Sequence, residues 1–348
     1  MTKNLEGGFI ISADWHVHCW VDGGEPVNGI NGRLKDFLFA FQDMIGYAKE
    51  HEVEKIYVLG DIFHLKKAIP VQAFDQLWLY VWHARTIGWE FLAGNHDRED
   101  DRYDSVTIIP FKQFGDVWTD PYVDKKNSTV LVPWLYDQAK VIKFMKDLGK
   151  KEFDLLLFHG EMEGALIGPS DYAMKSKVNE KTFGLNRFDR KFAGHLHKQQ
   201  LIGGVHYPGS LIAKDFGEIE TDKGFLHVVG KTVKSIPVRY PKFITYQLND
   251  WKESDLDRMI AGVKGNFVRV ISEQAVDPSV VKRFENANPR ILRFKLERSV
   301  HETSVAKPEA VGEKSWDGMV ESYCEQKGTP PELMNEYVNY GLKTLRGA

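Results

Sequence analysis

The sequence is poor in cysteine and in long apolar runs, and each shortage excludes a class of protein. Only Cys19 and Cys324 occur in 348 residues, so a scaffold held by disulfides is excluded and a reducing compartment is expected. No uncharged apolar run reaches the roughly 18 residues that a membrane span needs. The first residues lack an apolar segment with a cleavage site, so export is not expected and the cytoplasm is the predicted location.

An excess of charge of one sign is also missing. The 46 Lys and Arg nearly balance the 49 Asp and Glu, which gives a formal net charge of -3. This argues against a protein that coats nucleic acid by bulk electrostatics, so any contact with DNA would depend on local patches or bound metals. The length predicts two or more domains.

Five short motifs each follow an apolar run that is typical of a strand. All carry carboxylate, amide or imidazole side chains, and ligands of α/β sheets gather beyond the carboxyl ends of strands. We therefore expect the motifs to meet at one site. They are Asp14-Trp15-His16, Gly60-Asp61-Ile62-Phe63-His64, Gly94-Asn95-His96-Asp97, Phe158-His159-Gly160 and Gly194-His195-Leu196-His197.

The donor atoms of these motifs suit two divalent cations. Cations about 3.5–4 Å apart can hold a water and an ester phosphate, and they lower the pKa of that water toward about 7. Mixed nitrogen and oxygen ligands favour manganese, iron or zinc over calcium or magnesium. Two manganese ions are the predicted cofactors, with magnesium, iron and zinc as alternatives. Cys19 falls outside the spacing and is interpreted as a small buried apolar residue.

In this order the five motifs resemble those of the calcineurin-like metallophosphoesterases. Three further segments are similar to SbcD-type nuclease subunits of double-strand-break complexes and to the related subunits of phage recombination endonucleases. The resemblance covers about residues 8–230 well and the remainder in outline. The three segments are Tyr207-Pro208-Gly209-Ser210, Asp215-Phe216-Gly217-Glu218 and Lys223-Gly224-Phe225, beside the Phe63-His64 ending of the second motif.

The resemblance implies two metal shells that share Asp61 as a bridge. The first shell consists of Asp14, His16, Asp61 and His197. The second consists of Asp61, Asn95, His159 and His195. A lone histidine such as His159 is more often a structural residue, and only its place in the set makes it a ligand candidate.

The resemblance also implies roles for the remaining motif residues. His96 would lie beside the scissile phosphate as proton donor or transition-state stabiliser, and His64 would help to position the phosphate or the strand. Asp97 is interpreted as a partner that orients His96 or a ligand imidazole. The histidines outside the motifs are interpreted as structural, and His18 stands nearest to a motif. They are His18, His51, His83, His206, His227 and His301.

Hydrophobic periodicity predicts a β-α-β-α-β series at the start of the chain, with helices over residues 33–51 and 70–82. Residues 200–205, 224–229 and 232–238 predict antiparallel hairpins that close a second sheet. The resemblance then implies the fold class, α/β with a two-sheet β-sandwich flanked by helices, and assigns residues 1–240 to a nuclease domain.

The rest of the chain predicts further modules. Residues 241–298 alternate strand and helix as a small α/β domain, which by resemblance caps the site, a dimerisation or stability module being the alternative. Residues 299–313 are a predicted linker. Residues 314–348 predict two amphipathic helices that bind an SbcC-type coiled-coil ATPase, or else pack on the chain itself.

Two charged segments are candidates for substrate contact. Residues 98–104 follow the third motif, and they are either a solvated turn or a loop in which Arg98 contacts a phosphate. Residues 161–190 mix basic and aromatic side chains, and they either bind a strand or form a surface excursion.

Together these patterns predict a metal-dependent DNA phosphodiesterase. By resemblance it would be a 3'-to-5' double-strand exonuclease and single-strand endonuclease, a homodimer acting with its ATPase partner on DNA ends in a bacterial or, if phage-encoded, a host cytoplasm. One alternative is a phosphatase or small-molecule phosphodiesterase of the same superfamily. Another is a binding subunit with a vestigial metal site, which the complete set of ligand positions disfavours.

Overall fold

The computed structural model describes residues 7–100, 105–167, 172–218, 222–248, 253–272, 276–287 and 292–296. Residues 1–297 form one compact unit. The predicted linker and helical pair, residues 299–348, lie outside the described residues. Among the described helices, none combines the length and hydropathy that a membrane crossing requires.

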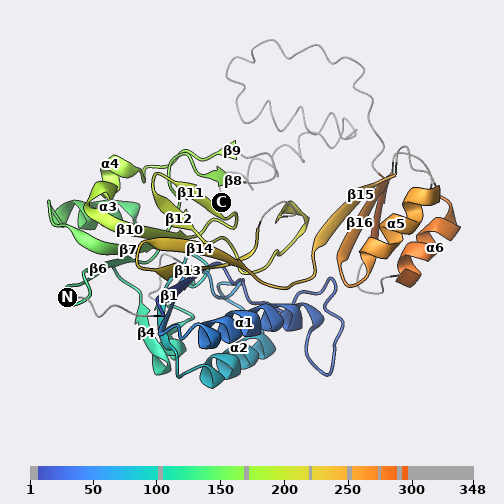
Figure 1. Cartoon of the computed structure of the whole chain (residues 1–348), viewed down its shortest axis with the longest axis horizontal. Coiled ribbons are helices and arrows are strands. Elements are labelled where there is room, and N and C mark those ends of the chain that lie inside the picture. The colour runs from blue at the N-terminus through green and yellow to red at the C-terminus, as the bar shows by residue number, and fades with distance from the viewer. Residues whose placement is uncertain are drawn as a thin grey trace, which may run out of the picture. The chain divides into compact units, whose positions relative to one another are not determined.

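The first sheet has six strands in the order β14-β13-β1-β2-β3-β4 (Figure 1). Its four parallel strands are β1 (Phe9–Ser12), β2 (Lys55–Leu59), β3 (Gly88–Leu92) and β4 (Gly115–Trp118). The hairpin of β13 (Gly224–Val229) and β14 (Thr232–Pro237) joins this sheet because β13 pairs antiparallel with β1. Its predicted place in the second sheet was wrong, since turn signals define a hairpin but not the edge that it joins.

The second sheet has the order β11-β12-β10-β7-β6-β5. Its four adjacent strands β12, β10, β7 and β6 run parallel. Residues 200–205, which were predicted as one strand, instead contain a turn, so β11 and β12 form an antiparallel hairpin at one edge. The strands are β5 (Tyr122–Asp124), β6 (Thr129–Val132), β7 (Phe153–His159), β10 (Phe188–Gly194), β11 (Gln200–Ile202) and β12 (Val205–Tyr207).

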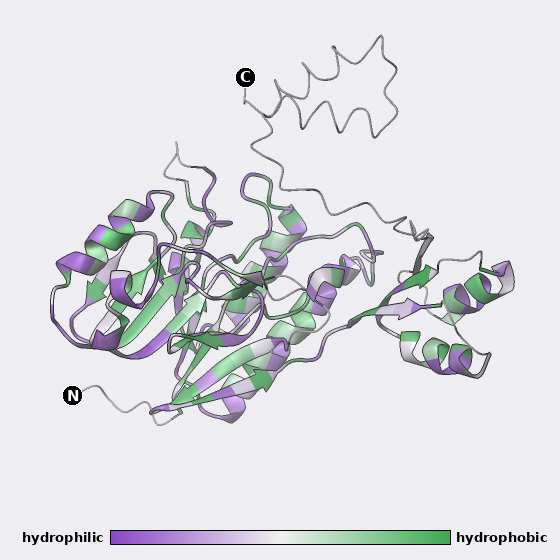
Figure 2. Ribbon diagram, turned by 90° about the horizontal axis from the view of Figure 1, so that it is seen from above, coloured by the Kyte–Doolittle hydropathy of each residue, from purple (hydrophilic) through white to green (hydrophobic). Residues whose placement is uncertain are grey.

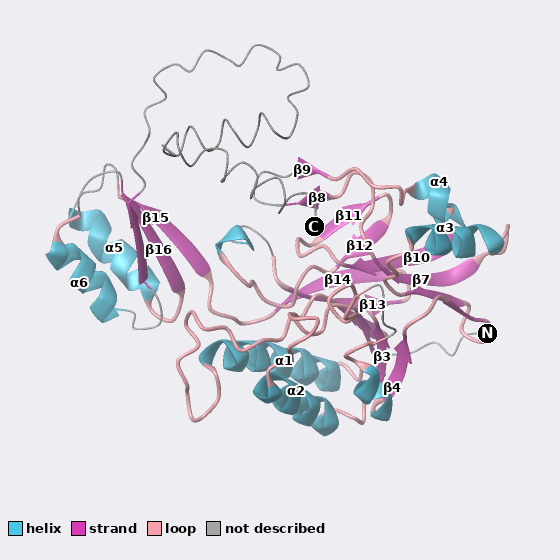
Figure 3. Cartoon of the chain, turned by 180° about the vertical axis from the view of Figure 1, so that it is seen from behind, coloured by secondary structure: helices cyan, strands magenta, loops and turns pink. Residues whose placement is uncertain are grey.

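The two sheets pack face to face through apolar side chains that alternate along the strands. Ile11 and Leu59 of the first sheet share a buried cluster with Leu157 and Phe192 of the second. Figure 2 shows the hydrophobic residues concentrated along these strands. The opposite faces bury against helices, so the predicted two-sheet sandwich flanked by helices is confirmed (Figure 3).

The helices cover the outer faces of the sandwich. The first sheet is covered by α1 (Gly32–Glu50), α2 (Val71–His83) and the short η1 (Ile109–Gln113). The second sheet is covered by α3 (Gln138–Asp147), α4 (Glu180–Phe183) and η2 (Leu185–Arg187). Asn31 caps α1 by accepting hydrogen bonds from the backbone N–H groups of Arg33 and Leu34, as an N-cap side chain should.

The last described elements form a small sheet with its own core, in the strand-helix-strand-helix-strand order that the sequence predicts. Its apolar cluster includes Leu256, Val270 and Phe284. The strands are parallel, in the order β15-β16-β17. The elements are β15 (Phe243–Gln247), α5 (Glu253–Val263), β16 (Phe267–Ser272), α6 (Pro278–Ala287) and β17 (Leu292–Leu296).

Candidate metal centre

The seven predicted metal ligands come together where strands of both sheets end. Each ligand is the last residue of a strand or lies within four residues after its end, and the strands concerned are β1, β2, β3, β7 and β10. The two sheets touch at this edge, where the Nδ1–H of His159 donates to the carbonyl oxygen of Leu59 at 2.6 Å. The ligands fall into two groups around Asp61, whose carboxyl oxygens face one group each.

The first group consists of Asp14, His16 and His197, whose ligand atoms lie within 4.8 Å of one another. The Nε2 atoms of His16 and His197 are 3.0 Å apart, and the Nε2 of His16 is 3.7 Å from the Oδ2 of Asp61. Two imidazole nitrogens that face each other beside buried carboxylates are a donor set that suits one divalent cation.

The second group consists of Asp61, His159 and His195, again within 4.8 Å of one another. Asn95 completes it, because its Oδ1 lies 3.1 Å from the Nε2 of His159 and 2.9 Å from the Nδ1 of His195. The Oδ1 of Asp61 is 3.5 Å from the Nε2 of His159. Asp61 therefore occupies the position that a bridging carboxylate requires.

The electrostatics of the cluster also fit bound cations. Burial, followed by the negative charge of Asp61, raises the pKa of Asp14 well above its usual value. Burial, followed by the charge of Lys214, lowers the pKa of His16, and burial followed by His159 lowers the pKa of His195 to about 3. The imidazoles of His16 and His195 thus favour the neutral form and offer lone pairs, while the paired carboxylates gain from any cation placed between them.

Hydrogen bonds behind the ligands fix their orientation. The Nδ1–H of His197 donates to the Oε1 of Glu218 at 3.0 Å, which leaves its Nε2 facing the first group. The carboxylate of Asp14 accepts the backbone N–H of His195 at 3.0 and 2.9 Å. Such contacts set the tautomer and the direction of a metal ligand.

The backbone is strained at the ligands. Asp14, His16, Asp61 and His195 have φ values of 52°, 44°, 55° and 101°, and they are four of the seven non-glycine residues with positive φ in the described part of the chain. Such conformations cost about 1–3 kcal/mol each and gather at functional sites. Gly94 permits the close approach of the loops, because a Cβ there would lie 2.2 Å from the Oδ1 of Asp61.

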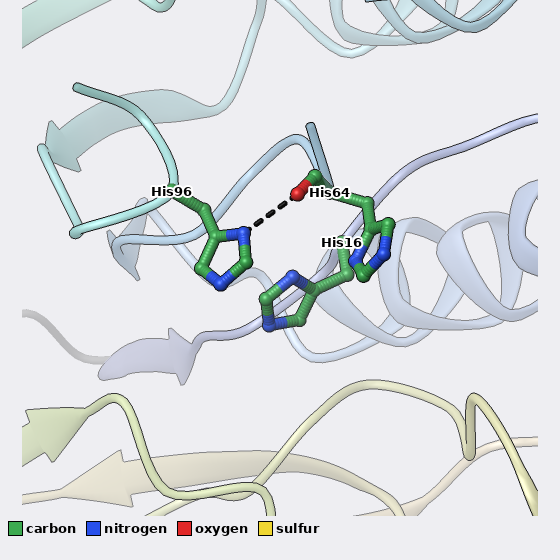
Figure 4. Close-up of side chains that lie close together, drawn as sticks. All are labelled: His16, His64 and His96. Atoms are coloured by element: carbon green, nitrogen blue, oxygen red, sulfur yellow. Dashed lines mark hydrogen bonds between the residues drawn. The ribbon is translucent and has the colours of Figure 1, made fainter. Parts of the chain in front are cut away.

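His96 and His64 lie beside the first group (Figure 4). The Nδ1–H of His96 donates to the carbonyl oxygen of His64 at 2.6 Å, and the backbone N–H of His96 donates to the Oδ1 of Asp61 at 2.8 Å. The ring of His96 is 4.7 Å from that of His16. With its Nδ1 engaged, His96 has its Nε2 as the ring nitrogen that remains for a further contact.

His64 stacks at the rim of this site. Its ring lies 5.7 Å from that of His96 and 4.4 Å from that of Trp20, and His18 is 5.5 Å away. Burial, followed by the charge of Lys214, lowers the pKa of His64 to about 4. At neutral pH a neutral His64 could position a phosphate by hydrogen bonding only.

Asp97 supports the loops rather than an imidazole. Its carboxylate accepts the backbone N–H groups of Asp61, Ile62 and Gly94 at 2.8, 3.0 and 2.8 Å. The expectation that it orients His96 or a ligand imidazole was therefore wrong. Because Asp97 is fully buried beneath two motif loops, it ties the second motif to the third.

Arg98 is a structural residue. It is 7% exposed, its Nε–H donates to the carbonyl oxygen of Trp134 at 2.7 Å, and its guanidinium also binds the carbonyl oxygen of Thr119. The hypothesis that Arg98 contacts a substrate phosphate is overturned, because the guanidinium binds the segments that follow β4 and β6. Residues 101–104 of the same loop lie outside the described residues.

The structure describes residues 161–167 and 172–190 of the predicted excursion. It carries the short strands β8 (Leu166–Ile167) and β9 (Tyr172–Ala173), which pair antiparallel, and the helical turns α4 and η2. Arg187 donates to the carbonyl oxygens of Met145 and Phe183, and Arg190 donates to that of Gly230. These two arginines therefore bind backbone carbonyl oxygens of neighbouring segments. Lys175, Lys177 and Lys181 are exposed.

Two residues near the ligands were not predicted as site residues. The Oε2 of Glu218, opposite its contact with His197, accepts from Lys223 at 2.5 Å and from the Ser210 hydroxyl at 3.1 Å. Burial would raise the pKa of Glu218, but the His197 hydrogen bond and the Lys223 charge lower it to about 2. Lys214 places its Nζ 3.3 Å from the Nε2 of His197. The only sequence signal for Glu218 was its place in the SbcD-like segment.

Comparisons with known proteins agree with this geometry in part. The family model described as calcineurin-like phosphoesterase matches residues 8–199. Among solved structures, a crystal structure of the Pseudomonas putida nuclease MPE is similar at 15% sequence identity and a TM-score of 0.28. That match covers 57% of this chain and 66% of the other, slightly under two thirds of its length. A likeness at this level is too weak to support a conclusion.

Proposed function

The chain belongs to the calcineurin-like phosphoesterases, whose family model covers more than half of it, and from that premise we propose that it is a nuclease of the SbcD type. Family membership and the two ligand groups make it a metal-dependent phosphoester hydrolase. The proposed substrate is DNA.

One observation carries the step from hydrolase to nuclease. Glu218 belongs to the segment that resembles SbcD-type subunits, and its carboxylate orients the metal-ligand candidate His197. Phe216 of the same segment lies 5.0 Å from Phe243 of the predicted capping domain. Support for the SbcD type is therefore that one residue of the resembling segment, Glu218, contacts a metal-ligand candidate.

The proposal gives each of these side chains a role. Asp14, His16, Asp61 and His197 would hold one cation and Asp61, Asn95, His159 and His195 the other, and bound cations would supply an activated water and neutralise phosphate charge. His96 would hold a proton at its Nε2. From there it would stabilise the charge on the phosphate or give the proton to the leaving 3' oxygen.

The remaining parts of the proposal rest on sequence resemblance. They are the 3'-to-5' exonuclease and single-strand endonuclease activities, a homodimeric state, and the binding of an SbcC-type ATPase through residues 314–348. DNA repair and recombination in the cytoplasm would be the setting.

A nuclease assay with His96→Ala tests the proposal. End-labelled duplex and single-stranded DNA would be incubated with manganese and either the native chain or the variant. We expect cutting to fall by about 10²–10⁴-fold, the usual contribution of a general acid or base, while calorimetry shows metal still bound. His83→Ala is the control, because His83 is exposed on α2 and outside every motif.

Cutting at the native rate by His96→Ala would overturn the role of His96. A native chain that hydrolyses p-nitrophenyl phosphate faster than bis-(p-nitrophenyl) phosphate, and leaves DNA intact, would favour a phosphatase instead.

A further inference from the structure

A pocket of about 380 Å³ opens beside the metal centre. Its polar lining is His195, His197, Lys198, Asp215 and Glu218. Three apolar side chains in or directly after the β8–β9 hairpin complete it, and they are Leu166, Ile167 and Met174. The two histidines belong to different ligand groups. A phosphate held by both groups would therefore have its substituents at the mouth of this pocket.

The apolar wall of the pocket is held in place. The backbone N–H of Leu166 donates to the side-chain Oε1 of Gln200 at 2.8 Å, and the Nε2 of Gln200 donates back to the carbonyl oxygen of Leu166 at 3.1 Å. The backbone N–H of Met174 donates to the carbonyl oxygen of Ala165 at 2.8 Å. Ile167 and Met174 pack on the core of the second sheet yet stay partly exposed.

The chemistry of the lining selects the occupant. Pockets of about 300–1,000 Å³ accept small molecules, so this one suits a single nucleoside and excludes a stacked, paired duplex. Apolar side chains and a polarizable thioether favour the flat face of a base. The carboxylates of Asp215 and Glu218 also line the pocket, and carboxylates accept hydrogen bonds from the exocyclic amino groups of bases.

We propose that the pocket of Leu166, Ile167 and Met174 binds the nucleobase attached to the phosphate being cut, so that the strand is unpaired at the cut. The inference rests on the proposed nuclease function. If the base is bound in this way, the enzyme either unpairs the end of a duplex before it cuts or acts on DNA that is already single-stranded.

A single strand with one abasic residue at a known position tests this. At the phosphates beside the abasic residue the native chain should cut about 10-fold more slowly than elsewhere, the effect of losing roughly 1–2 kcal/mol of apolar burial. The Met174→Ala variant should cut at normal positions about 10-fold more slowly than the native chain. Its rates at normal and abasic positions should therefore differ less. Leu201→Ala is the matched control, since Leu201 is 58% exposed on β11, outside the pocket lining.

A fluorescence measurement gives a second result that does not need turnover. Single-stranded DNA containing 2-aminopurine should change its emission on binding to the native chain and to Leu201→Ala. For Leu166→Ala or Met174→Ala, the same change in emission should need about 10-fold more protein.

The outcomes are distinct. If no DNA is cut while bis-(p-nitrophenyl) phosphate is hydrolysed, the nuclease function fails and the pocket proposal with it. If DNA is cut at equal rates beside the abasic residue and elsewhere, the pocket proposal alone is overturned.

Discussion

Glu218 shows how one buried carboxylate can organise several charged groups. It orients the ring of His197 and accepts the Lys223 ammonium, and the Nζ of Lys214 lies 3.9 Å from its Oε1. Lys223 is almost fully buried, so its charge depends on this partner. Through its hydrogen bond to His197, Glu218 can thus decide the geometry of a metal-ligand candidate.

Replacing Glu218 by glutamine should weaken metal binding. The amide keeps the shape but loses the charge that fixes the tautomer of His197, so we expect the manganese affinity to fall by about 10–100-fold. Isothermal titration calorimetry measures it. Asp215→Asn is the control, because Asp215 is exposed in the same segment and its Oδ1 accepts the backbone N–H of Gly217. An unchanged affinity in Glu218→Gln would contradict the assigned role.

At the scale of elements, the first turn of α1 joins segments that are distant in sequence. Arg33 is 6% exposed, and its guanidinium donates to the carbonyl oxygens of Lys214 at 2.6 Å and Asp22 at 3.3 Å. The same guanidinium lies 4.6 Å from the ring of Phe267 and 5.2 Å from that of Phe243. One side chain therefore connects α1, the segment beside His197, and strands β15 and β16.

Arg33→Met should loosen this junction. Losing hydrogen bonds from a buried charged donor costs about 2 kcal/mol, which in a chain of this length corresponds to a Tm decrease of about 3–4 °C. Amide hydrogen exchange should accelerate in residues 211–218 and 243–247. Arg85→Met is a suitable control, since Arg85 is exposed near the end of α2. Native exchange rates in both segments would show that Arg33 does not hold the junction.

At the scale of the whole molecule, the metal centre lies where two sheets meet, and each sheet supplies ligands. Cations bound there would cross-link the sandwich and favour the folded state over the unfolded chain. Metal-free protein keeps Asp14 and Asp61 buried together, and the pKa of Asp14 is raised by burial and by Asp61. Because the raised pKa favours the protonated form of Asp14, this carboxyl group must lose its proton when a cation binds to it.

Manganese should stabilise the protein more at pH 8 than at pH 6. A carboxyl group with a raised pKa retains its proton to higher pH, so lowering the pH opposes metal binding at Asp14. His195 and His64, with pKa values of about 3 and about 4, stay neutral over this range and do not contribute. At a manganese concentration of 100 times its Kd, the free energy of unfolding should rise by about 2.7 kcal/mol, which raises the Tm by roughly 5 °C.

Thermal unfolding at pH 6, 7 and 8 with and without manganese measures this gain. Asp14→Asn should lose most of it at every pH. A gain that is equal or larger at pH 6 would show that Asp14 does not control the pH dependence.

The sequence by itself determined the strands of the first βαβ series, the order of the last small domain and the seven side chains that gather at the metal centre. Each ligand ends a strand or follows one within four residues, so a local pattern and the shared direction of parallel strands are sufficient to predict where it lies.

Only the tertiary structure decided what each residue meets across the sandwich. The hairpin β13–β14 joined the first sheet, Asp97 bound backbone amides, Arg98 was buried, and Glu218 reached His197 from 21 residues away. The pocket beside His195 likewise needs the β8–β9 hairpin and the last motif together. These pairings depend on how distant segments pack, and short-range periodicity holds no information about which partner a side chain will contact.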